Sequence, residues 1–338
     1  GAAPGPAAYG RGGQQPTVTD ANVVLGRLNS SYFLGGEMPL DEDASHKVIA
    51  TLASALSLDT AATAEGILTI VTANMANAIR SRTVQKGIDP RDFSLVAFGG
   101  AGPLHAVDVA LALDMSEVII PLYPGITSAV GLLTTDLRYD TIRTEFQVSE
   151  NMDLARLNDD LADMEKELTT QFLADGLDHA DISFLRSGDL RYVGQGYELR
   201  VNIPSGLLDE ERTAEVFNQF HEQHRAEYGH DFPDSPIEIV NARVTGIGQM
   251  PKIGRPQVNS DQAKNTDSIT SAPCMFRANG SLESFDTAFY QRELLPIEEP
   301  IEGPAIILQR DSTTVVPPGN TFTADAANNI IIRIGETT

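Results

Sequence analysis

Hydrophobic residues in the first third of the chain recur with helical spacing. Between Val48 and Leu56 they fall at i, i+1, i+4, i+7 and i+8, on one face of a helix that Asp41 or Asp43 can cap. A second run, with apolar positions every three or four residues, predicts a helix over 60–86 that a glycine closes. The N-terminal region therefore begins with helices that each bury one face.

After these helices, the helical spacing of apolar residues gives way to a short continuous apolar run. Residues 95–98 are apolar and end at Gly99, as expected for a strand buried on both faces. Pro103 suits the first turn of a helix, and residues 118–120 predict the next strand. Strand, glycine turn, helix and strand in this order indicate an α/β unit over 1–145.

The rest of the chain has a different order of elements. Residues 146–250 predict a helix over 154–173, two strands, a helix over 209–228 and a further strand, which indicates a separate α+β domain. Residues 251–270 are polar without apolar periodicity, so they predict a linker or a long surface loop. Residues 271–338 carry short apolar runs around a Pro-Pro-Gly turn, which predicts a β-rich C-terminal domain.

The composition disfavours some classes of binding partner and indicates a cellular compartment. The 338 residues include 24 Lys and Arg against 47 Asp and Glu, a formal net charge of −23 that disfavours nucleic acids and anionic membranes as partners. No apolar run approaches the ~20 residues of a membrane helix. Cys274 is the single cysteine, which excludes an intrachain disulfide, and we expect a cytoplasmic protein.

The segment between the first predicted strand and the following helix is rich in glycine. Gly99, Gly100, Ala101 and Gly102 let backbone approach a flat ligand closely, and the helix offers free N–H groups. The spacing matches neither a Walker A loop nor G-x-G-x-x-G, so a tight turn and a ligand loop both stay open. His105, in the first helical turn, is either a packing residue or a ligand contact.

Motifs are spread along nearly the whole chain. They lie at 4–13 (PGPAAYGRGG), 16–22 (PTVTDAN), 99–106 (GGAGPLHA), 124–129 (PGITSA), 190–199 (LRYVGQGYEL), 303–307 (GPAII) and 311–314 (DSTT). In this order they resemble the landmarks of the ATP-dependent hydantoinase A and 5-oxoprolinase family.

This resemblance implies that residues 1–145 form the C-terminal half of an actin-like, sugar-kinase-like (ribonuclease H-like) ATPase fold. In that fold ATP and Mg²⁺ activate a carbonyl oxygen by phosphoryl transfer, and Gly99, Gly100, Ala101 and Gly102, with His105, would lie against adenine and ribose. The resemblance also implies a cyclic amide substrate of the hydantoin or 5-oxoproline type and a B-type second subunit in a hetero-oligomer.

The phosphate loops of the family are expected upstream of Gly1, and this sequence does not contain them. Phosphoryl transfer needs Mg²⁺ and donors around the γ-phosphate. We therefore expect the C-terminal part of a longer amidohydrolase, inactive by itself, with the missing N-terminal part as a partner. Two alternatives stay open: a subunit of an ATP-dependent ketone carboxylase, and a non-catalytic assembly module.

Asp20 is a candidate catalytic residue. Its carboxylate can orient a metal-bound water or a substrate amide if it faces a cleft. The alternative is helix capping, because Thr19, Asp20 and Asn22 are capping residue types just before an apolar run.

Two further groups of side chains are candidate binding residues. Arg191, Gln195 and Glu198 bracket a glycine-rich bend and are candidate substrate contacts, with cross-strand pairing as the alternative. His221 and His224 are three residues apart on one predicted helix, so with a third ligand they can bind zinc or manganese. The alternative for the two histidines is a structural pair.

Overall fold

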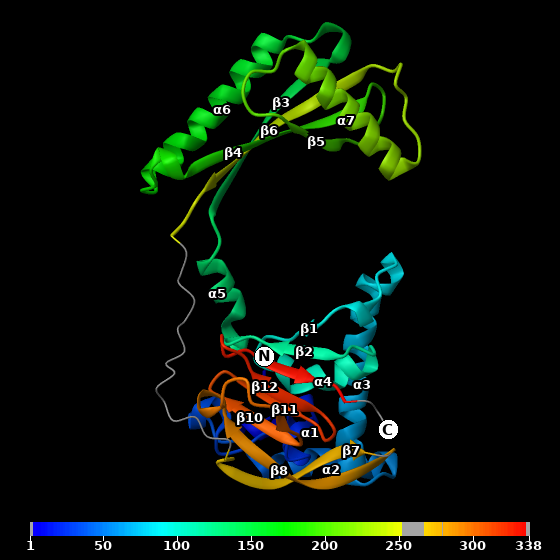
Figure 1. Cartoon of the computed structure of the whole chain (residues 1–338). Coiled ribbons are helices and arrows are strands. Elements are labelled where there is room, and N and C mark those ends of the chain that lie inside the picture. Colours follow the sequence, from blue (N-terminus) through cyan, green and yellow to red (C-terminus); the bar gives the residue numbers. More distant parts are fainter. Residues whose placement is uncertain (1–2, 252–266, 279, 336–338) are drawn as a thin grey trace. The chain divides into compact units, whose positions relative to one another are not determined.

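The computed structural model describes residues 3–251, 267–278 and 280–335 (Figure 1). The chain forms two compact units, one made of residues 1–131 with 254–338 and the other of residues 132–253. We call them unit 1 and unit 2; unit 2 is thus inserted between two segments of unit 1. Within the described ranges, none of the helices combines the length and apolarity needed to span a bilayer.

Aspartates start four of the helices. The side chains of Asp41, Asp59, Asp153 and Asp209 each accept a hydrogen bond from the backbone N–H three residues on, which satisfies a donor that the helix leaves free. These caps fix where each helix begins. The helices are α1 (Val18–Val24), α2 (Glu42–Leu56), α3 (Thr60–Arg82), α4 (Gly102–Ala112), α5 (Thr127–Leu133), α6 (Leu154–Ala174) and α7 (Glu210–Tyr228).

Unit 1 contains two sheets in its described part. One has the strand order β1-β2-β13-β12-β9, and the other has the order β11-β10-β8-β7. The strands are β1 (Leu95–Val96), β2 (Glu117–Ile120), β7 (Thr270–Ala278), β8 (Ser281–Gln291), β9 (Ile301–Glu302), β10 (Ala305–Gln309), β11 (Ser312–Val316), β12 (Thr321–Ala324) and β13 (Ile330–Arg333).

One hydrophobic cluster of unit 1 joins α4 to the first of these sheets. Val118 and Ile120 of β2 pack with Ile330 and Ile332 of β13, and all four are fully buried because alternate residues of a strand share one face. Val107 of α4 joins the same cluster. Each such side chain contributes about 2 kcal/mol of burial free energy, which holds the two ends of unit 1 together.

A glycine lets the N-terminal segment run against β7. Gly26 has a φ of +74°, and a Cβ there would lie 2.6 Å from the carbonyl oxygen of Pro273. This close approach allows the Met275 N–H to donate to the Leu25 oxygen at 2.9 Å, and the Cys274 thiol to donate to the Gly26 oxygen at 3.0 Å. The buried Cys274 is therefore a packing residue at this junction.

Unit 2 is a four-stranded antiparallel sheet, in the order β3-β6-β4-β5, with helices α6 and α7 packed on one face (Figure 1). Gly246 and Gly248 of β6 leave room for the ring of Phe172 from α6. The buried side of α6 repeats every three or four residues, as its sequence predicts: Leu157, Leu161, Met164, Leu168 and Phe172. The strands are β3 (Leu137–Val148), β4 (Ile182–Tyr192), β5 (Leu199–Ile203) and β6 (Ile237–Gly248).

The predicted division at 145 and 271 differs from this arrangement. Residues 132–145 belong to unit 2 because β3 pairs with β6 along its length. Residues 271–335 do not form a separate domain, since β13 pairs with β2 and β7 contacts the N-terminal segment. Of the predicted linker 251–270, residues 252–266 lie outside the described residues, and β7 already begins at Thr270.

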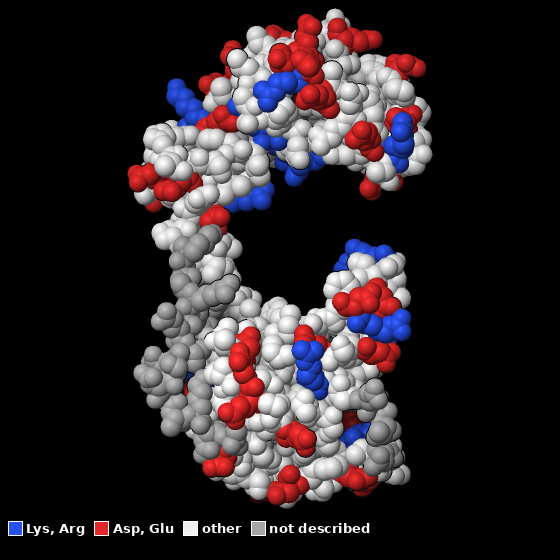
Figure 2. Space-filling view, in the orientation of Figure 1, with Lys and Arg blue, Asp and Glu red and all other residues white. Residues whose placement is uncertain are grey.

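The surface charge is mixed on the face in view. Figure 2 shows acidic side chains over both units, with Lys and Arg lying among them. Charge alone therefore marks no site on this face.

Candidate functional site

The glycine loop between β1 and α4 is held by two other segments of unit 1. The Gly99 N–H donates to the Pro124 oxygen at 2.6 Å, and the Ser312 hydroxyl donates to the Gly100 oxygen at 3.2 Å. The Gly125 N–H in turn donates to the Asp311 carboxylate at 2.8 Å. Three motifs that lie far apart in the sequence, at 99–106, 124–129 and 311–314, therefore meet here.

The conformation of this loop requires glycine at one position. Gly99 has a φ of +87°, in the left-handed region that L side chains rarely adopt, while a Cβ there would meet no atom within 4 Å. The requirement comes from the backbone alone. Gly100 and Ala101 are exposed, and Pro103 occupies the first turn of α4, where its missing N–H costs nothing.

A cavity of about 260 Å³ adjoins the loop. Gly100, Ala101 and Asp311 contribute to its lining, and so do the rings of Tyr9, Tyr32 and Phe33. The Tyr9 and Phe33 rings are 5.8 Å apart between centroids. Flat apolar rings beside exposed backbone and one carboxylate are a lining that suits a planar heterocycle with hydrogen-bonding edges.

His105 does not contribute to the lining of this cavity. It is buried in the first turn of α4, and its Nδ1 has no hydrogen-bond partner among the described residues. Burial, with a smaller effect of the Arg27 charge, lowers the pKa of His105 from 6.5 to about 4. The imidazole is thus neutral at physiological pH, as a packing residue would be.

Asp20 is completely buried and is surrounded by donors. Its carboxylate accepts hydrogen bonds from Ala8 N–H at 2.8 Å, from the N–H and hydroxyl of Thr17 at 3.0 and 2.7 Å, and from the Ser45 hydroxyl at 2.9 Å. Ala7 N–H adds a longer bond. Thr17, not Asp20, is the N-cap of α1, and Asp20 completes the capping box. This geometry gives Asp20 the capping role rather than the catalytic one.

The predicted substrate contacts in unit 2 are paired with neighbouring side chains. Arg191 binds Glu238 at 2.7 Å and Glu198 at 3.4 Å, across neighbouring strands and the bend. The Gln195 side chain contacts His224 Nε2 at 3.1 Å. Cross-strand pairing therefore describes Arg191 and Glu198, and Gln195 ties the bend to α7.

The two histidines of α7 also have protein partners. His221 Nδ1 contacts the Tyr192 hydroxyl at 2.6 Å, and His224 Nδ1 contacts the His230 oxygen at 2.7 Å. Since Gln195 contacts the other nitrogen of His224, both ring nitrogens of His224 are already in use. Nowhere in the described ranges do three His, Cys, Asp or Glu side chains gather in a way that could hold a metal.

Comparisons with known proteins agree with the motifs. A family profile described as hydantoinase/oxoprolinase matches residues 1–141, and one for the hydantoinase/oxoprolinase C-terminal domain matches residues 146–333. The caprolactamase subunit alpha of Pseudomonas jessenii is 32% identical over 325 residues, which is 94% of this chain and 46% of that protein. The acetophenone carboxylase gamma subunit of Aromatoleum aromaticum is 32% identical over 98% of this chain and 47% of its own length.

Two solved structures have a similar fold. The ATP-dependent caprolactamase of Pseudomonas jessenii aligns with a TM-score of 0.73 and 31% identity, over 99% of this chain and 49% of that one. Nucleotide-free acetone carboxylase aligns with a TM-score of 0.84 over 97% of this chain and 48% of that one; at 23% identity, it supports the fold alone. The chain therefore spans about half the length of these relatives, and it belongs to the hydantoinase/oxoprolinase family.

Proposed function

We propose that this chain is the C-terminal part of an ATP-dependent enzyme that hydrolyses a cyclic amide, with an actin-like nucleotide fold in unit 1. The observation that supports the proposal most is the meeting of three family motifs at the glycine loop, beside a cavity lined by aromatic rings. Membership of the hydantoinase/oxoprolinase family supports an amide substrate. The similarity to an ATP-dependent caprolactamase supports the nucleotide.

In this proposal the chain's own residues bind the base and ribose. Exposed backbone at Gly100 and Ala101 can lie against the base, because neither places a long side chain in the way. The rings of Tyr9, Tyr32 and Phe33 can pack on its faces. When bound with Mg²⁺, ATP supplies a phosphoryl group that makes the amide carbonyl a better target for water. We assign the triphosphate contacts to the part of the longer relatives that this chain does not match.

The proposal includes a hetero-oligomer in the cytoplasm. The caprolactamase and acetophenone carboxylase relatives are both named as subunits. A B-type subunit, together with the unmatched half, would complete the site for a substrate of the hydantoin or 5-oxoproline type. The chain by itself would then bind nucleotide weakly and turn over no substrate.

Calorimetry with Mg-ATP tests the nucleotide site. The titration uses this chain and a version extended at its N-terminus to the length of the relatives. We expect binding by the extended protein, and at least tenfold weaker binding after Ala101→Glu, because a long charged side chain would occupy the space proposed for the base. Ala55→Glu, an exposed position on α2, is the matched control and should leave the affinity unchanged.

Absence of binding by both proteins would contradict the nucleotide site. The reaction is tested separately by following ADP release from the extended protein with its second subunit. Release that depends on a cyclic amide supports the proposal. Release that depends instead on a ketone and bicarbonate would replace the hydrolase with a carboxylase.

A further inference from the structure

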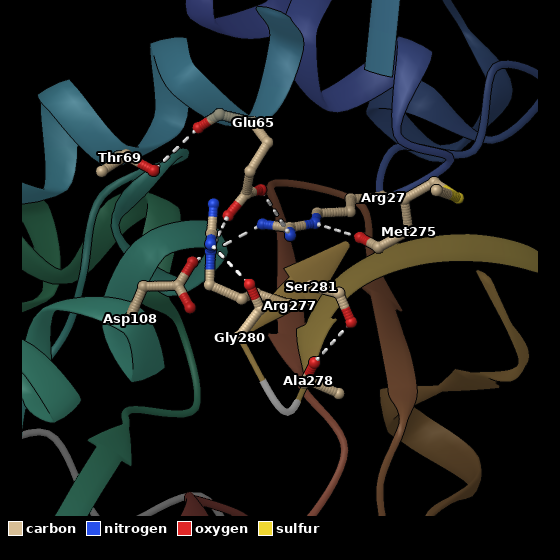
Figure 3. A network of polar contacts seen from close by, with 9 residues as sticks. All are labelled: Arg27, Glu65, Thr69, Asp108, Met275, Arg277, Ala278, Gly280 and Ser281. Carbon is tan, nitrogen blue, oxygen red and sulfur yellow. Dashed lines mark hydrogen bonds and ion pairs between the residues drawn. The ribbon is translucent and has the colours of Figure 1, made fainter. Parts of the chain in front are cut away.

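Unit 1 contains a second and larger cavity, of about 850 Å³, which shares no lining residue with the cavity at the glycine loop. Helices α3 and α4, the hairpin of β7 and β8, and the turn 317–320 form its walls. Its volume lies within the range of small-molecule sites, roughly 300–1,000 Å³. The residues that give it charge are shown in Figure 3.

A buried ion pair forms the inner wall. Arg27 is 3% exposed, and its guanidinium donates to Glu65 at 3.3 Å and to the Met275 oxygen at 3.1 Å. The same group lies 4.9 Å from the centre of the Phe276 ring. Arg27 and Glu65 therefore satisfy each other, and this pair is a fixed part of the wall rather than a free binding group.

Asp108 of α4 differs from this ion pair, because few polar contacts offset the burial of its carboxylate. Its only polar partner in the described part of the chain is Arg27, at 3.5 Å, and a third of its side chain is exposed. Burial raises the pKa of Asp108, and the Arg27 charge opposes this only in part. A carboxylate that lines a cavity without receiving a hydrogen bond has capacity for a cationic donor.

Arg277 of β7 has the complementary property. Its side chain is 56% exposed, and its two contacts are long, 3.4 Å to Glu65 and 3.5 Å to the Gly280 oxygen. Among the described residues no ion pair joins Arg277 to Asp108. Figure 3 shows both side chains directed toward the same group of charges. The cavity thus presents a carboxylate and a guanidinium that each have unused hydrogen-bonding capacity.

We propose that this cavity binds an amino acid, with its ammonium group on Asp108 and its carboxylate on Arg277. Leu68, Leu111 and Phe285 line the cavity as well and would contact the apolar body of the ligand. A zwitterion uses the spare hydrogen-bonding capacity of both groups at once, whereas a simple anion or cation uses that of only one.

The charge pattern also connects this cavity to the reaction. Hydrolysis of a lactam of the 5-oxoproline type releases one ammonium and one carboxylate on a single molecule, so the product from such a substrate belongs to this class. A hydantoin would instead give an N-carbamoyl acid, which has no ammonium. This connection rests on the proposed function, while binding of an amino acid does not. Because the cavity is separate from the glycine loop, the product would bind there and regulate the enzyme without occupying the nucleotide site.

Calorimetry on the 338-residue chain without ATP tests the site. The probes are 6-aminohexanoate and its isomer L-norleucine, which carry the same two charges at different separations. Hexanoate and hexylamine are the controls that lack one charge each. We expect one isomer to bind at least tenfold more tightly than either control. Equal affinity of hexanoate or hexylamine, or no binding of either isomer, would overturn the proposal.

Variants then locate the ligand. Asp108→Asn and Arg277→Gln should each weaken binding of the preferred isomer at least tenfold. Glu283→Gln removes a charge from the same cavity and should change binding less than twofold, because Glu283 is paired with Ser281. Unchanged affinity in the first two variants, with melting temperatures like that of the original chain, would refute the site. Since no nucleotide is present, this result is independent of the ATP titration.

Discussion

The Ser312 hydroxyl donates a hydrogen bond to the carbonyl oxygen of Gly100 at 3.2 Å and so joins the start of β11 to the glycine loop. The next residue back, Asp311, binds the Gly125 N–H. The loop is thus positioned by segments from both parts of unit 1. Its shape depends on long-range contacts as well as on its own glycines.

Gly99→Ala should destabilise unit 1 by about 1–2 kcal/mol, because alanine is strained at a φ of +87° while its methyl group meets no neighbour. Urea unfolding measures the change. The matched control is Gly102→Ala, which lies in α4, where alanine is favoured, and whose Cβ would only touch Ala97 at 3.9 Å. Equal stabilities of the two variants would contradict the strain argument.

Asp20→Asn should cost about 2–3 kcal/mol of unfolding free energy, since an amide nitrogen would face the donors that the buried carboxylate now accepts. Asp41→Asn serves as the comparison. It replaces an exposed N-cap of α2 by an equally good one, so its effect should stay within a few tenths of a kcal/mol, roughly the measurement error. Thermal and urea unfolding of both variants measures these changes in unfolding free energy.

The low pKa of His105 predicts a pH dependence of stability. The unfolded chain gains a proton at this residue near pH 6.5, but the folded chain does so only near pH 4. The unfolding free energy should therefore fall as pH drops through this interval, by up to about 3 kcal/mol. His105→Gln should remove that share of the dependence, whereas replacing the exposed His46 by Gln should leave it in place. An NMR titration giving His105 an ordinary pKa would contradict the prediction.

Tyr192→Phe should weaken unit 2 by about 1–3 kcal/mol, because the hydroxyl accepts from the Phe232 N–H at 2.9 Å and shares a hydrogen bond with His221 Nδ1 at 2.6 Å. Loss of this contact should change the nitrogen chemical shifts of the His221 ring in the variant. Tyr197→Phe, at a tyrosine that is 80% exposed, should alter neither property.

The helices were predictable because their signals are local. The predicted helices 154–173 and 209–228 match α6 and α7 within a residue at each end, since an aspartate cap and an apolar period define both. The helix predicted over 60–86 instead ends at Arg82, and Gly87 closes a short 3₁₀ turn after it. Strand partners were not predictable, because β2 and β13 are similar short apolar runs in different parts of the sequence.

The site shows the same division between local and distant information. The Thr-x-x-Asp pattern at Thr17 and Asp20 was a readable capping signal, although it does not tell that Asp20 also reaches Ser45 of α2. Asp311 and Ser312 gave no sign of contacting the glycine loop, because nothing in a hydroxyl-rich turn specifies its partner. The spacing of His221 and His224 was correct for one helix face, but their neighbours could not be read from it.

The place of β13 in its sheet sets an order for synthesis. This strand lies between β2 and β12, so the first sheet of unit 1 cannot close until residue 333 has left the ribosome. Unit 2 is encoded within residues 132–253 and can complete its own sheet earlier. A nascent chain would then carry a folded unit 2 while the apolar residues of β2 are not yet paired with β13. At this stage the exposed apolar surface is most prone to aggregation and most in need of a chaperone.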